Sequence, residues 1–454
     1  MKIKLILAAD PSDPLRKNDP FMPLSLPLLA ACAPGHDYTL VDMLREDDPR
    51  IDEPCDLVGI SVRQSARECA FALADRFRER GVRVVVGGPH VSMIPYLAAQ
   101  HADIVVVGEG EELWPQILDD VLSGHPARYY VCSPHPFDGK GETLIQRYSF
   151  PDMTRIPVAR RDLYRRKYVF DTVFASRGCP VDCDFCCVTS LFGPQVRLRP
   201  VDAVVDEIAT FKRYYYLLDD TVFGRPATWD YYLHLYDEIC RRTARRYWTG
   251  QANLDAAREE KGREVIRRAV DAGLLYAAIG IESINPRTLE ACGAHRKNGV
   301  RSGEELLDVM CSSIRFIQDR GVLLSGWFVI GYDSDSLQDY EATLAFCRDM
   351  HLVPAIFPVN PIEGTRLHAR LARAGRTGTS RLNPTGHPHM DDAQILAALR
   401  HIFARGYSPW ALLARTLHLV PRFSRDRIHR TIFSLITQYK LKGGIDLYHT
   451  APPR

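Results

Sequence analysis

The chain lacks a long apolar run and an excess of charge of either sign. Its longest notable uncharged stretch, residues 20–35, is too short to span a bilayer and contains four prolines. The apolar residues 5–9 end at Asp10 and leave no apolar core for a signal peptide. Lys and Arg number 58 against 56 Asp and Glu, a formal net charge of +2. We therefore expect a cytoplasmic protein that neither spans a membrane nor binds nucleic acid.

The composition is that of a folded protein. Of the 454 residues, 46% are hydrophobic and 25% are charged. A chain of this length suits two or three domains. Twelve cysteines without a secretion signal indicate reduced thiols, metal ligands or catalysis rather than a disulfide framework.

The first part of the chain alternates short apolar runs with stretches of helical periodicity. Helical spacing covers residues 65–80 and 112–122, and the pattern predicts a doubly wound, Rossmann-like α/β domain over residues 1–125. Residues 126–168 are rich in Pro, Gly, His and Arg, and we expect them to be a linker. The predicted strands of the first domain are residues 3–9, 38–41, 57–62, 82–86 and 104–107.

A second alternating series follows. Six strand–helix units predict a partial (β/α)6 barrel over residues 169–365, with its site at the carboxyl ends of the strands. Residues 366–454 are expected to be mostly helical. The predicted strands are residues 169–176, 214–218, 247–251, 275–281, 323–330 and 353–359.

Three cysteines directly after the first strand of this second series are the most specific feature. Cys179, Cys183 and Cys186 lie within eight residues, and three thiolates on a 4Fe–4S cluster leave one iron free for another ligand. A zinc site is the chief alternative, but it needs four ligands and no second pair follows at zinc-finger spacing. Ordinary reduced core cysteines are the third interpretation.

The Cys-x-x-x-Cys-x-x-Cys spacing resembles the radical S-adenosylmethionine (SAM) superfamily. The resemblance extends to residues 176–180, to Leu218-Asp219-Asp220 and to Gly280-Ile281-Glu282-Ser283. The first half of the chain resembles the cobalamin-binding domain often fused to this superfamily. It does so at residues 57–61, 87–91 and 108–111, so the two resemblances cover nearly the whole chain. The Asp-x-His-x-x-Gly signature of many cobalamin proteins is missing, and the lower ligand of cobalt is not predicted.

The resemblance implies a role for each matching residue. Cys179, Cys183 and Cys186 would hold the 4Fe–4S cluster. Asp219 and Asp220 would meet the α-ammonium group of SAM, although capping of the strand end is the alternative for such a pair. The other implied contacts are Glu282 and Ser283 to the ribose, Phe185 to the adenine, and Ser61, Gly87, Gly88, Gly108, Gly110 and His90 to cobalamin.

The resemblance also implies a reaction. It is methylation of an unactivated carbon of a small-molecule or lipid-like substrate, through a 5′-deoxyadenosyl radical and methylcobalamin. An electron donor such as flavodoxin or ferredoxin would serve the cluster. Three alternatives stay open: a cobalamin-dependent cyclase or oxidoreductase, a radical SAM enzyme that has lost cobalamin, and a non-enzymatic iron–sulfur and cobalamin binding protein. The sequence specifies neither the substrate nor the oligomeric state.

The segment of residues 410–439 mixes apolar residues with five arginines, at positions 415, 422, 425, 427 and 430. Contact with a membrane or with an anionic lipid-like substrate is one interpretation of such a pattern. An amphipathic helix packed on its own domain is the more common origin, so membrane contact is not expected.

Overall fold

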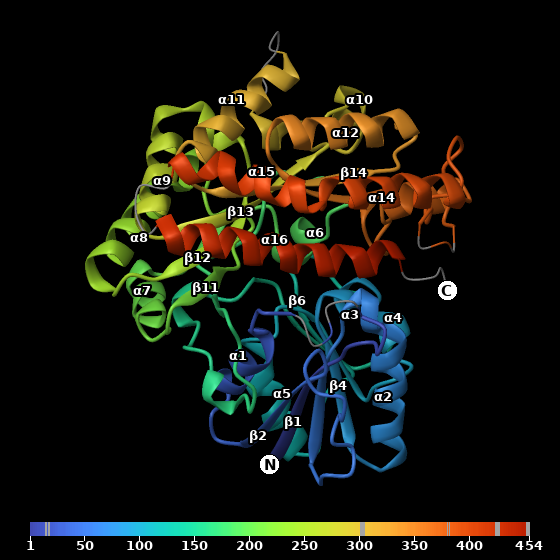
Figure 1. Cartoon of the computed structure of the whole chain (residues 1–454). Helices are drawn as coiled ribbons and strands as arrows, with labels where there is room; N and C mark the ends of the chain where they lie inside the picture. The colour runs from blue at the N-terminus through green and yellow to red at the C-terminus, as the bar shows by residue number, and fades with distance from the viewer. Residues whose placement is uncertain are drawn as a thin grey trace. The chain divides into compact units, whose positions relative to one another are not determined.

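The computed structural model describes residues 1–13, 16, 19–299, 305–378, 380, 382–422 and 427–450. The chain divides into two compact units. The colours of Figure 1, which follow the residue number, show which part of the chain is which. The first unit comprises Met1–Thr172 and Ser190–Pro200, and the second comprises Val173–Thr189 and Val201–Arg454. Each unit has its own sheet and its own core of buried residues.

The first unit is built on a seven-stranded parallel sheet in the order β2-β1-β3-β4-β5-β6-β7. Val84, Val85 and Val86 of β4 are all buried, because helices cover both faces of such a sheet. Its strands are β1 (Lys2–Leu7), β2 (Asp37–Asp42), β3 (Leu57–Ser61), β4 (Arg83–Gly87), β5 (Ile104–Gly108), β6 (Tyr129–Cys132) and β7 (Leu144–Arg147), and its helices are α1 (Ser25–Cys32), α2 (Arg67–Glu79), α3 (Pro89–Met93), α4 (Pro95–Ala98) and α5 (Leu113–Leu122).

Residues 126–168 contribute to this sheet, although the sequence suggests a linker. Strands β6 and β7 extend the sheet beyond β5, and Tyr130 and Val131 of β6 are fully buried. Each of these strands has four residues, which is too short for an alternating or continuous apolar pattern to stand out from the surrounding Pro, Gly and His. The first sheet therefore does not end at residue 125.

The second unit is built on a six-stranded sheet in chain order, β15-β14-β13-β12-β11-β8. Neighbouring strands from β11 to β15 pair in parallel, and β8 and β15 form the two edges. This open sheet agrees with the predicted six-unit partial barrel. The strands are β8 (Asp171–Val173), β11 (Tyr214–Leu217), β12 (Tyr247–Ala252), β13 (Leu274–Glu282), β14 (Leu323–Ile330) and β15 (Val353–Pro358). The segment after β8 contains β9 (Ser176–Arg177) and α6 (Val188–Phe192), after which β10 (Arg197–Leu198) belongs to the first unit.

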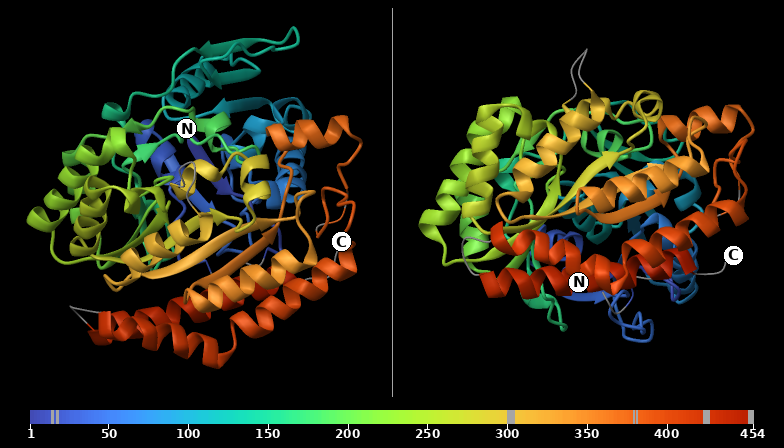
Figure 2. Two further views of the ribbon diagram at one scale, coloured as in Figure 1. Left: turned by 90° about the horizontal axis from the view of Figure 1, so that it is seen from above. Right: turned by 45° about the horizontal axis from the view of Figure 1, so that its top comes forward.

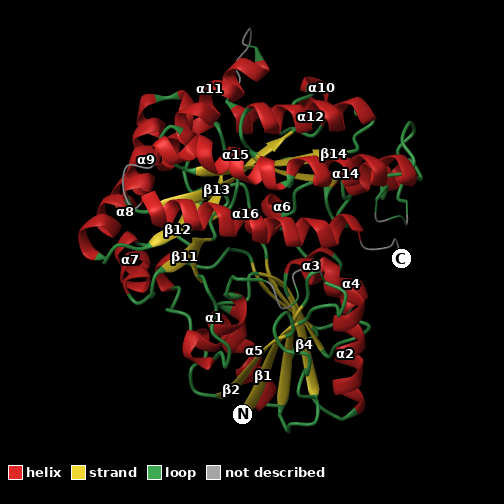
Figure 3. Cartoon of the chain, viewed as in Figure 1, coloured by secondary structure: helices red, strands yellow, loops and turns green. Residues whose placement is uncertain are grey.

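Helices alternate with these strands along the chain, and Figure 3 shows the helices in red around the yellow strands. In α9 the buried residues Val265, Ile266 and Ala269 recur at helical spacing, so one face packs into the core and the other carries charge. The helices of this unit are α7 (Val201–Ala209), α8 (Trp229–Arg242), α9 (Glu260–Asp271), α10 (Pro286–Ala291), α11 (Leu306–Gln318), α12 (Leu337–Asp349), α13 (Arg366–Arg373), α14 (Asp392–Gly406), α15 (Pro409–Leu419) and α16 (Arg427–Thr450).

The last helices close a separate small core against the sheet. Leu323 of β14 and Val353 of β15 pack there with Tyr407 and Leu419, which belong to the C-terminal helical region. That region is helical, as the sequence predicts. Among the described residues, no helix combines the length and the apolar character needed to cross a bilayer.

Candidate functional site at the strand ends

The three cysteines lie in the loop between β9 and α6, beyond the end of β8. Cys183 is buried, and Cys179 and Cys186 are partly buried. The backbone N–H of Cys186 donates to the carbonyl of Cys183 at 3.1 Å, and Thr189 Oγ1 donates to the carbonyl of Cys179 at 3.0 Å. The loop is therefore held by its own hydrogen bonds before any ligand binds.

Asp184 ties the cysteine loop to the rest of the second unit. Its carboxylate accepts hydrogen bonds from Tyr332 Oη at 2.6 Å and from Arg370 at 2.9 Å. Its backbone N–H donates to the carbonyl of Cys292 at 3.0 Å. Because Asp184 directly follows Cys183, these contacts fix the backbone from which two of the three thiols project.

Burial favours the protonated form of the Cys183 and Cys186 thiols while no metal is bound. Burial raises the pKa of Cys183 to about 12 and the pKa of Cys186 to about 11. A smaller contribution comes from the neighbouring thiols, since Cys186 raises the pKa of Cys183 and Cys179 raises the pKa of Cys186. Iron binds thiolates, and its positive charge replaces these protons.

The donor set suits a cluster. Among the described residues, no three His, Cys, Asp or Glu side chains are grouped as ligands of one metal ion. A cluster needs no such meeting point, because each of its cysteines binds a different iron atom. Three neighbouring, partly or fully buried thiols on one tethered loop therefore fit a 4Fe–4S cluster.

The two neighbouring aspartates after β11 occupy different environments. Asp219 is fully buried, and its carboxylate accepts hydrogen bonds from the N–H groups of Ala175 and Ser176 and from Tyr232 Oη, at 2.7, 3.1 and 2.7 Å. Asp220 accepts one hydrogen bond, from the N–H of Gly178 at 3.2 Å. Its second oxygen bonds to none of the described residues. Asp219 thus serves as a strand-end cap, whereas Asp220 can still bind a ligand.

Glu282 ends β13 and forms an ion pair that the sequence does not reveal. Its Oε1 atom accepts a hydrogen bond from Lys297 Nζ at 2.6 Å. Lys297 Nζ also lies 6.0 Å from the centroid of the Phe185 ring. Ser283 is buried, and its hydroxyl accepts from the N–H of Asn285 at 3.0 Å. The structure thus brings Glu282 and Phe185 together around Lys297.

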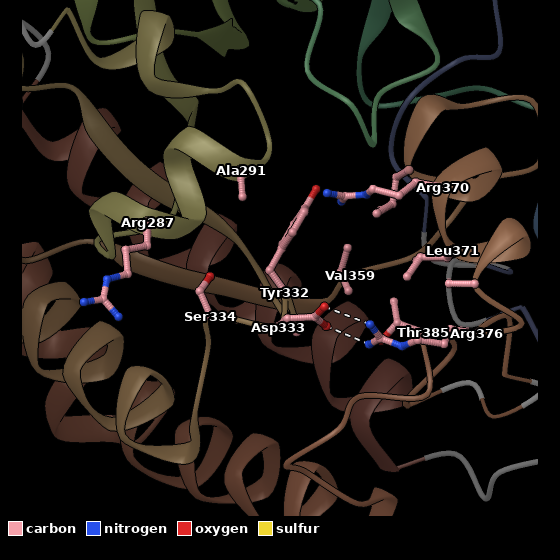
Figure 4. Close-up of a pocket in the computed structure, with 13 residues that line it drawn as sticks. Arg287, Ala291, Tyr332, Asp333, Ser334, Val359, Arg370, Leu371, Arg376 and Thr385 are labelled. Carbon is pink, nitrogen blue, oxygen red and sulfur yellow. Dashed lines mark hydrogen bonds and ion pairs between the residues drawn. The ribbon is translucent and has the colours of Figure 1, made fainter.

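A cavity of about 270 Å³ opens beside the end of β14, and Tyr332 forms part of its wall. Figure 4 shows Tyr332, Asp333 and Val359 between the arginines that line it. Arg376 is held by Asp333 through two hydrogen bonds of 2.8 and 2.6 Å, which the figure marks by dashed lines. Because Tyr332 also donates a hydrogen bond to Asp184, the wall of this cavity is connected directly to the cysteine loop.

The candidate cobalamin contacts gather at the carboxyl ends of the first sheet. Ser61 ends β3, Gly87 ends β4 and Gly108 ends β5, while Gly88, His90 and Gly110 lie just beyond. In a sheet of order 2-1-3-4-5 a ligand binds outside the strand ends, where the order reverses between β1 and β3. His90 lies in α3 and is buried. Ser61 is thus the predicted contact at the reversal.

Two of the glycines are also required by the fold. Gly108 has φ +83°, and a Cβ there would lie 2.2 Å from the carbonyl oxygen of Cys132. Gly88 has φ +103°, and a Cβ there would lie 3.0 Å from the backbone of Val62. A side chain at either position would strain the loop whether or not a ligand binds.

Four residues of the site carry no sequence signal of their own. The sequence assigned no role to Asp184, Tyr332, Arg370 or Lys297, because their partners lie 15, 148 or 186 residues away in the chain. Asp184 lies between two of the predicted cysteine ligands, and this position was the one available hint.

Comparison with known proteins matches part of the chain to one family. Residues 173–325 match the family model of the radical SAM superfamily. The bacteriochlorophyllide d C-8(2)-methyltransferase of Chlorobaculum tepidum is 28% identical over 362 residues, which cover 77% of this chain and 75% of that protein.

Two solved structures share the fold. The cobalamin-dependent SAM radical enzyme OxsB, with aqua-cobalamin and SAM bound, has a TM-score of 0.68 at 14% identity, covering 97% of this chain and 71% of its own. The radical SAM methyltransferase TsrM of Kitasatospora setae, with cobalamin and a [4Fe-4S] cluster bound, has a TM-score of 0.65 at 15% identity, covering 87% and 80%. The resemblance found in the sequence is confirmed.

Proposed function

The chain carries a radical SAM superfamily domain, and we propose that it is a cobalamin-dependent enzyme that methylates an unactivated carbon. The observation that carries this proposal is the placement of three neighbouring thiols on the loop after the first strand of that domain. The bacteriochlorophyllide methyltransferase, a relative over three quarters of its length, acts on a tetrapyrrole. An apolar small molecule, either a tetrapyrrole or a lipid, is accordingly the proposed substrate class.

Each cofactor has candidate residues in the chain. Cys179, Cys183 and Cys186 would hold a 4Fe–4S cluster. Asp220 is the better placed of the two aspartates to accept the α-ammonium group of SAM, because its second oxygen is available. The further proposed contacts are Asp219 as a support of the same strand end, Glu282 and Ser283 toward the ribose, Phe185 toward the adenine, and Ser61, Gly87, Gly88, Gly108, Gly110 and His90 toward cobalamin.

The bound cofactors supply a 5′-deoxyadenosyl radical and a transferable methyl group, and the protein orients them and excludes water. The contacts of Asp184 with Tyr332 and Arg370 keep the cysteine loop in place. The Lys297 ammonium holds Glu282 in one orientation. In this proposal residues 1–125 belong to the cobalamin-binding part, residues 169–365 form the radical SAM core and residues 366–454 complete the substrate site.

The decisive experiment uses the full chain purified without oxygen and reconstituted with iron, sulfide and hydroxocobalamin. With SAM and dithionite we expect 5′-deoxyadenosine, and with a tetrapyrrole or polycyclic lipid acceptor a product heavier by one methylene group. Loss of hydrogens from the acceptor would indicate cyclisation or oxidation instead. A bound cluster without 5′-deoxyadenosine would indicate a non-enzymatic binding protein.

Matched cysteine variants control this assay. Cys183→Ala is expected to lose the cluster and all 5′-deoxyadenosine formation. Cys347→Ala, which changes a buried cysteine of the same unit outside the loop, is expected to keep its iron. Zinc in place of iron in the wild-type protein would contradict the proposal. A cytoplasmic location and a flavodoxin or ferredoxin donor belong to the proposal, and replacing dithionite with either protein tests the donor.

A further inference from the structure

One large aromatic side chain is exposed in the interior of the second sheet. Trp327 of β14 is 39% exposed, although β13 and β15 pair with β14 on its two sides. Of the five tryptophans, Trp114, Trp229 and Trp248 are buried, and Trp410 is exposed on helix α15. A tryptophan on an interior strand is usually covered by another layer, because its ring is large and apolar. The exposure of Trp327 therefore indicates that something else covers it in use.

The alternation of side chains along β14 shows which face of the sheet is open. Leu324 and Phe328 belong to the larger core of the second unit, whereas Leu323 belongs to the small core with Tyr407. Trp327 follows Leu323 by four residues, so the two lie on the same face, which we call the inner face. The left view of Figure 2 shows the red C-terminal helices beside the orange strands of this unit. These helices cover the inner face at Leu323 and leave it open at Trp327.

The open part of the inner face continues across two further strands. Gln251 of β12 is exposed and pairs with Ala278 of β13, and Gly280, two residues further along β13, pairs with Trp327. Paired residues of parallel strands point to the same face, as do residues two apart on one strand. With strands about 4.8 Å apart, the open part is about 10 Å wide. This width suits a molecule of several fused or linked rings.

The Trp327 ring is held in place before any ligand binds. Its indole N–H donates a hydrogen bond to the hydroxyl of Tyr276. On the other side, the Phe357 ring of β15 lies with its centroid 5.8 Å from that of Trp327, at an interplanar angle of 52°. Gly280, the partner of Trp327 on β13, has no side chain that could cover the indole. An exposed and fixed ring of this kind is a ready surface for stacking.

This surface lies next to the cysteine loop. A Cβ at Gly280 would lie 2.7 Å from Glu282 Oε1 and 3.2 Å from Lys297 Nζ, so this ion pair occupies the inner face directly beside Trp327. Lys297 Nζ in turn lies 6.0 Å from the ring centroid of Phe185 in the cysteine loop. A molecule stacked on Trp327 is therefore placed beside the loop that carries the three thiols.

We propose that Trp327 is a specificity-determining residue, whose ring stacks on a planar, conjugated ring system of the substrate. The inference rests on the proposed function and narrows its substrate class from a tetrapyrrole or lipid to a flat, tetrapyrrole-like molecule. Stacking of flat rings is favourable beyond the apolar area that it buries, whereas a saturated polycyclic lipid gains from the area alone. Gln251, at the edge of the same surface, offers its amide to a polar substituent.

Equilibrium dialysis against protoporphyrin IX tests the stacking without any assay of activity. The holoprotein carries its cluster and hydroxocobalamin, so that the porphyrin cannot enter the corrin site. Trp327→Leu keeps an apolar side chain but no ring, and its porphyrin affinity is expected to fall about tenfold. Trp327→Phe keeps a ring and should stay within about threefold of wild type. Unchanged porphyrin affinity in Trp327→Leu would overturn the proposal.

A matched variant and a saturated probe provide the controls. Trp410→Leu changes the other exposed tryptophan and should bind the porphyrin as the wild type does. Cholestanol, a saturated polycyclic lipid, should bind Trp327→Leu and wild type equally well. An equal loss of affinity for both probes would make Trp327 a general apolar contact and would overturn the proposal.

Tryptophan emission provides a readout that does not depend on the leucine variant. Porphyrin stacked on Trp327 should quench the emission of the wild-type protein, and the quenched part should be smaller in Trp327→Phe, which keeps a ring at this position. Equal quenching in the two proteins would contradict the contact. Thermal unfolding of each variant shows whether it is folded.

The outcome is separable from that of the proposed function. Dialysis against SAM should give the same affinity for Trp327→Leu and wild type, because the proposed SAM contacts are other residues. Weaker SAM binding by this variant would assign Trp327 to the cofactor and overturn the inference, while the proposed methylation would stand. Absence of 5′-deoxyadenosine from the wild type would contradict the proposed function, and the porphyrin affinities could still be compared.

Discussion

Lys297 Nζ lies 2.6 Å from Glu282 Oε1, and the two side chains are only 15% and 9% exposed. Glu282 itself has φ +67°, a backbone conformation that residues other than glycine rarely adopt. The same ammonium group faces the Phe185 ring, and its charge opposes the rise in the pKa of Cys183 and Cys186 that burial causes. One cation thus links the end of β13 to the cysteine loop.

Removing that cation is predicted to damage the fold as well as the site. Lys297→Met leaves the Glu282 carboxylate buried without a partner, which should lower the free energy of unfolding by about 3–5 kcal/mol. Adding Glu282→Gln should restore most of the loss, because the isolated charge is gone. Urea denaturation of both variants measures this effect. Equal stability of the single and double variants would show that the pair is not coupled.

The two aspartates after β11 are predicted to fail in different ways. Asp219→Asn replaces an oxygen that accepts from the backbone of Ala175 and Ser176, or from Tyr232, and should cost about 1–3 kcal/mol of stability. Asp220→Asn should fold normally and bind SAM at least about tenfold more weakly, through loss of a charged partner. Thermal unfolding and equilibrium SAM binding distinguish the two. Weaker SAM binding by Asp219→Asn, together with unchanged SAM binding by Asp220→Asn, would instead make Asp219 the SAM ligand.

A pH dependence of stability follows from Asp220. Burial, assisted by the nearby Asp219, raises the pKa of Asp220 from 3.8 to about 6. The folded state therefore favours the neutral carboxyl group. This contribution to stability is complete below pH 3.8 and is lost as the pH rises through about 6, to a total of up to about 3 kcal/mol.

The corresponding measurement compares wild type with Asp220→Asn across this pH range. Since Asn does not titrate, the stability of the variant relative to wild type should rise as the pH rises through 6. SAM affinity of the wild type should rise over the same interval, because the carboxylate forms. A stability difference that does not change with pH would show that Asp220 ionises normally.

Two glycines at the candidate cobalamin site are predicted to separate folding from binding. Gly108→Ala forces a Cβ to 2.2 Å from a backbone oxygen at positive φ and should cost at least about 1–3 kcal/mol. At Gly110 the nearest atom to a new Cβ is a side-chain carbon of Leu29 at 3.3 Å, so Gly110→Ala should fold. Retention of the hydroxocobalamin spectrum after gel filtration then reports on binding. Normal folding of Gly108→Ala would contradict the structural role.

Local sequence patterns were enough to predict most of the strands. The apolar runs at residues 57–62, 104–107 and 323–330 became β3, β5 and β14 within one or two residues. Continuous β-branched runs flanked by glycine leave few alternatives. The four-residue strands β6 and β7 were missed because so few residues carry no periodicity. The cysteine motif could also be recognised in the sequence, since its three cysteines lie close together in the chain.

The sequence by itself determined where most strands of the two sheets, the cysteine loop and the amphipathic segment of residues 410–439 lie. Only the tertiary structure decided which groups meet. Asp184 and Tyr332 are 148 residues apart, and Asp184 and Arg370 are 186 residues apart. Periodicity shows that α15 and α16 are amphipathic but not that polar residues such as Arg415 are buried beside Leu419. The packing of the whole unit sets that choice, because it alone provides partners for Arg415, Arg430 and Gln438 inside and leaves Trp410 and Tyr439 outside.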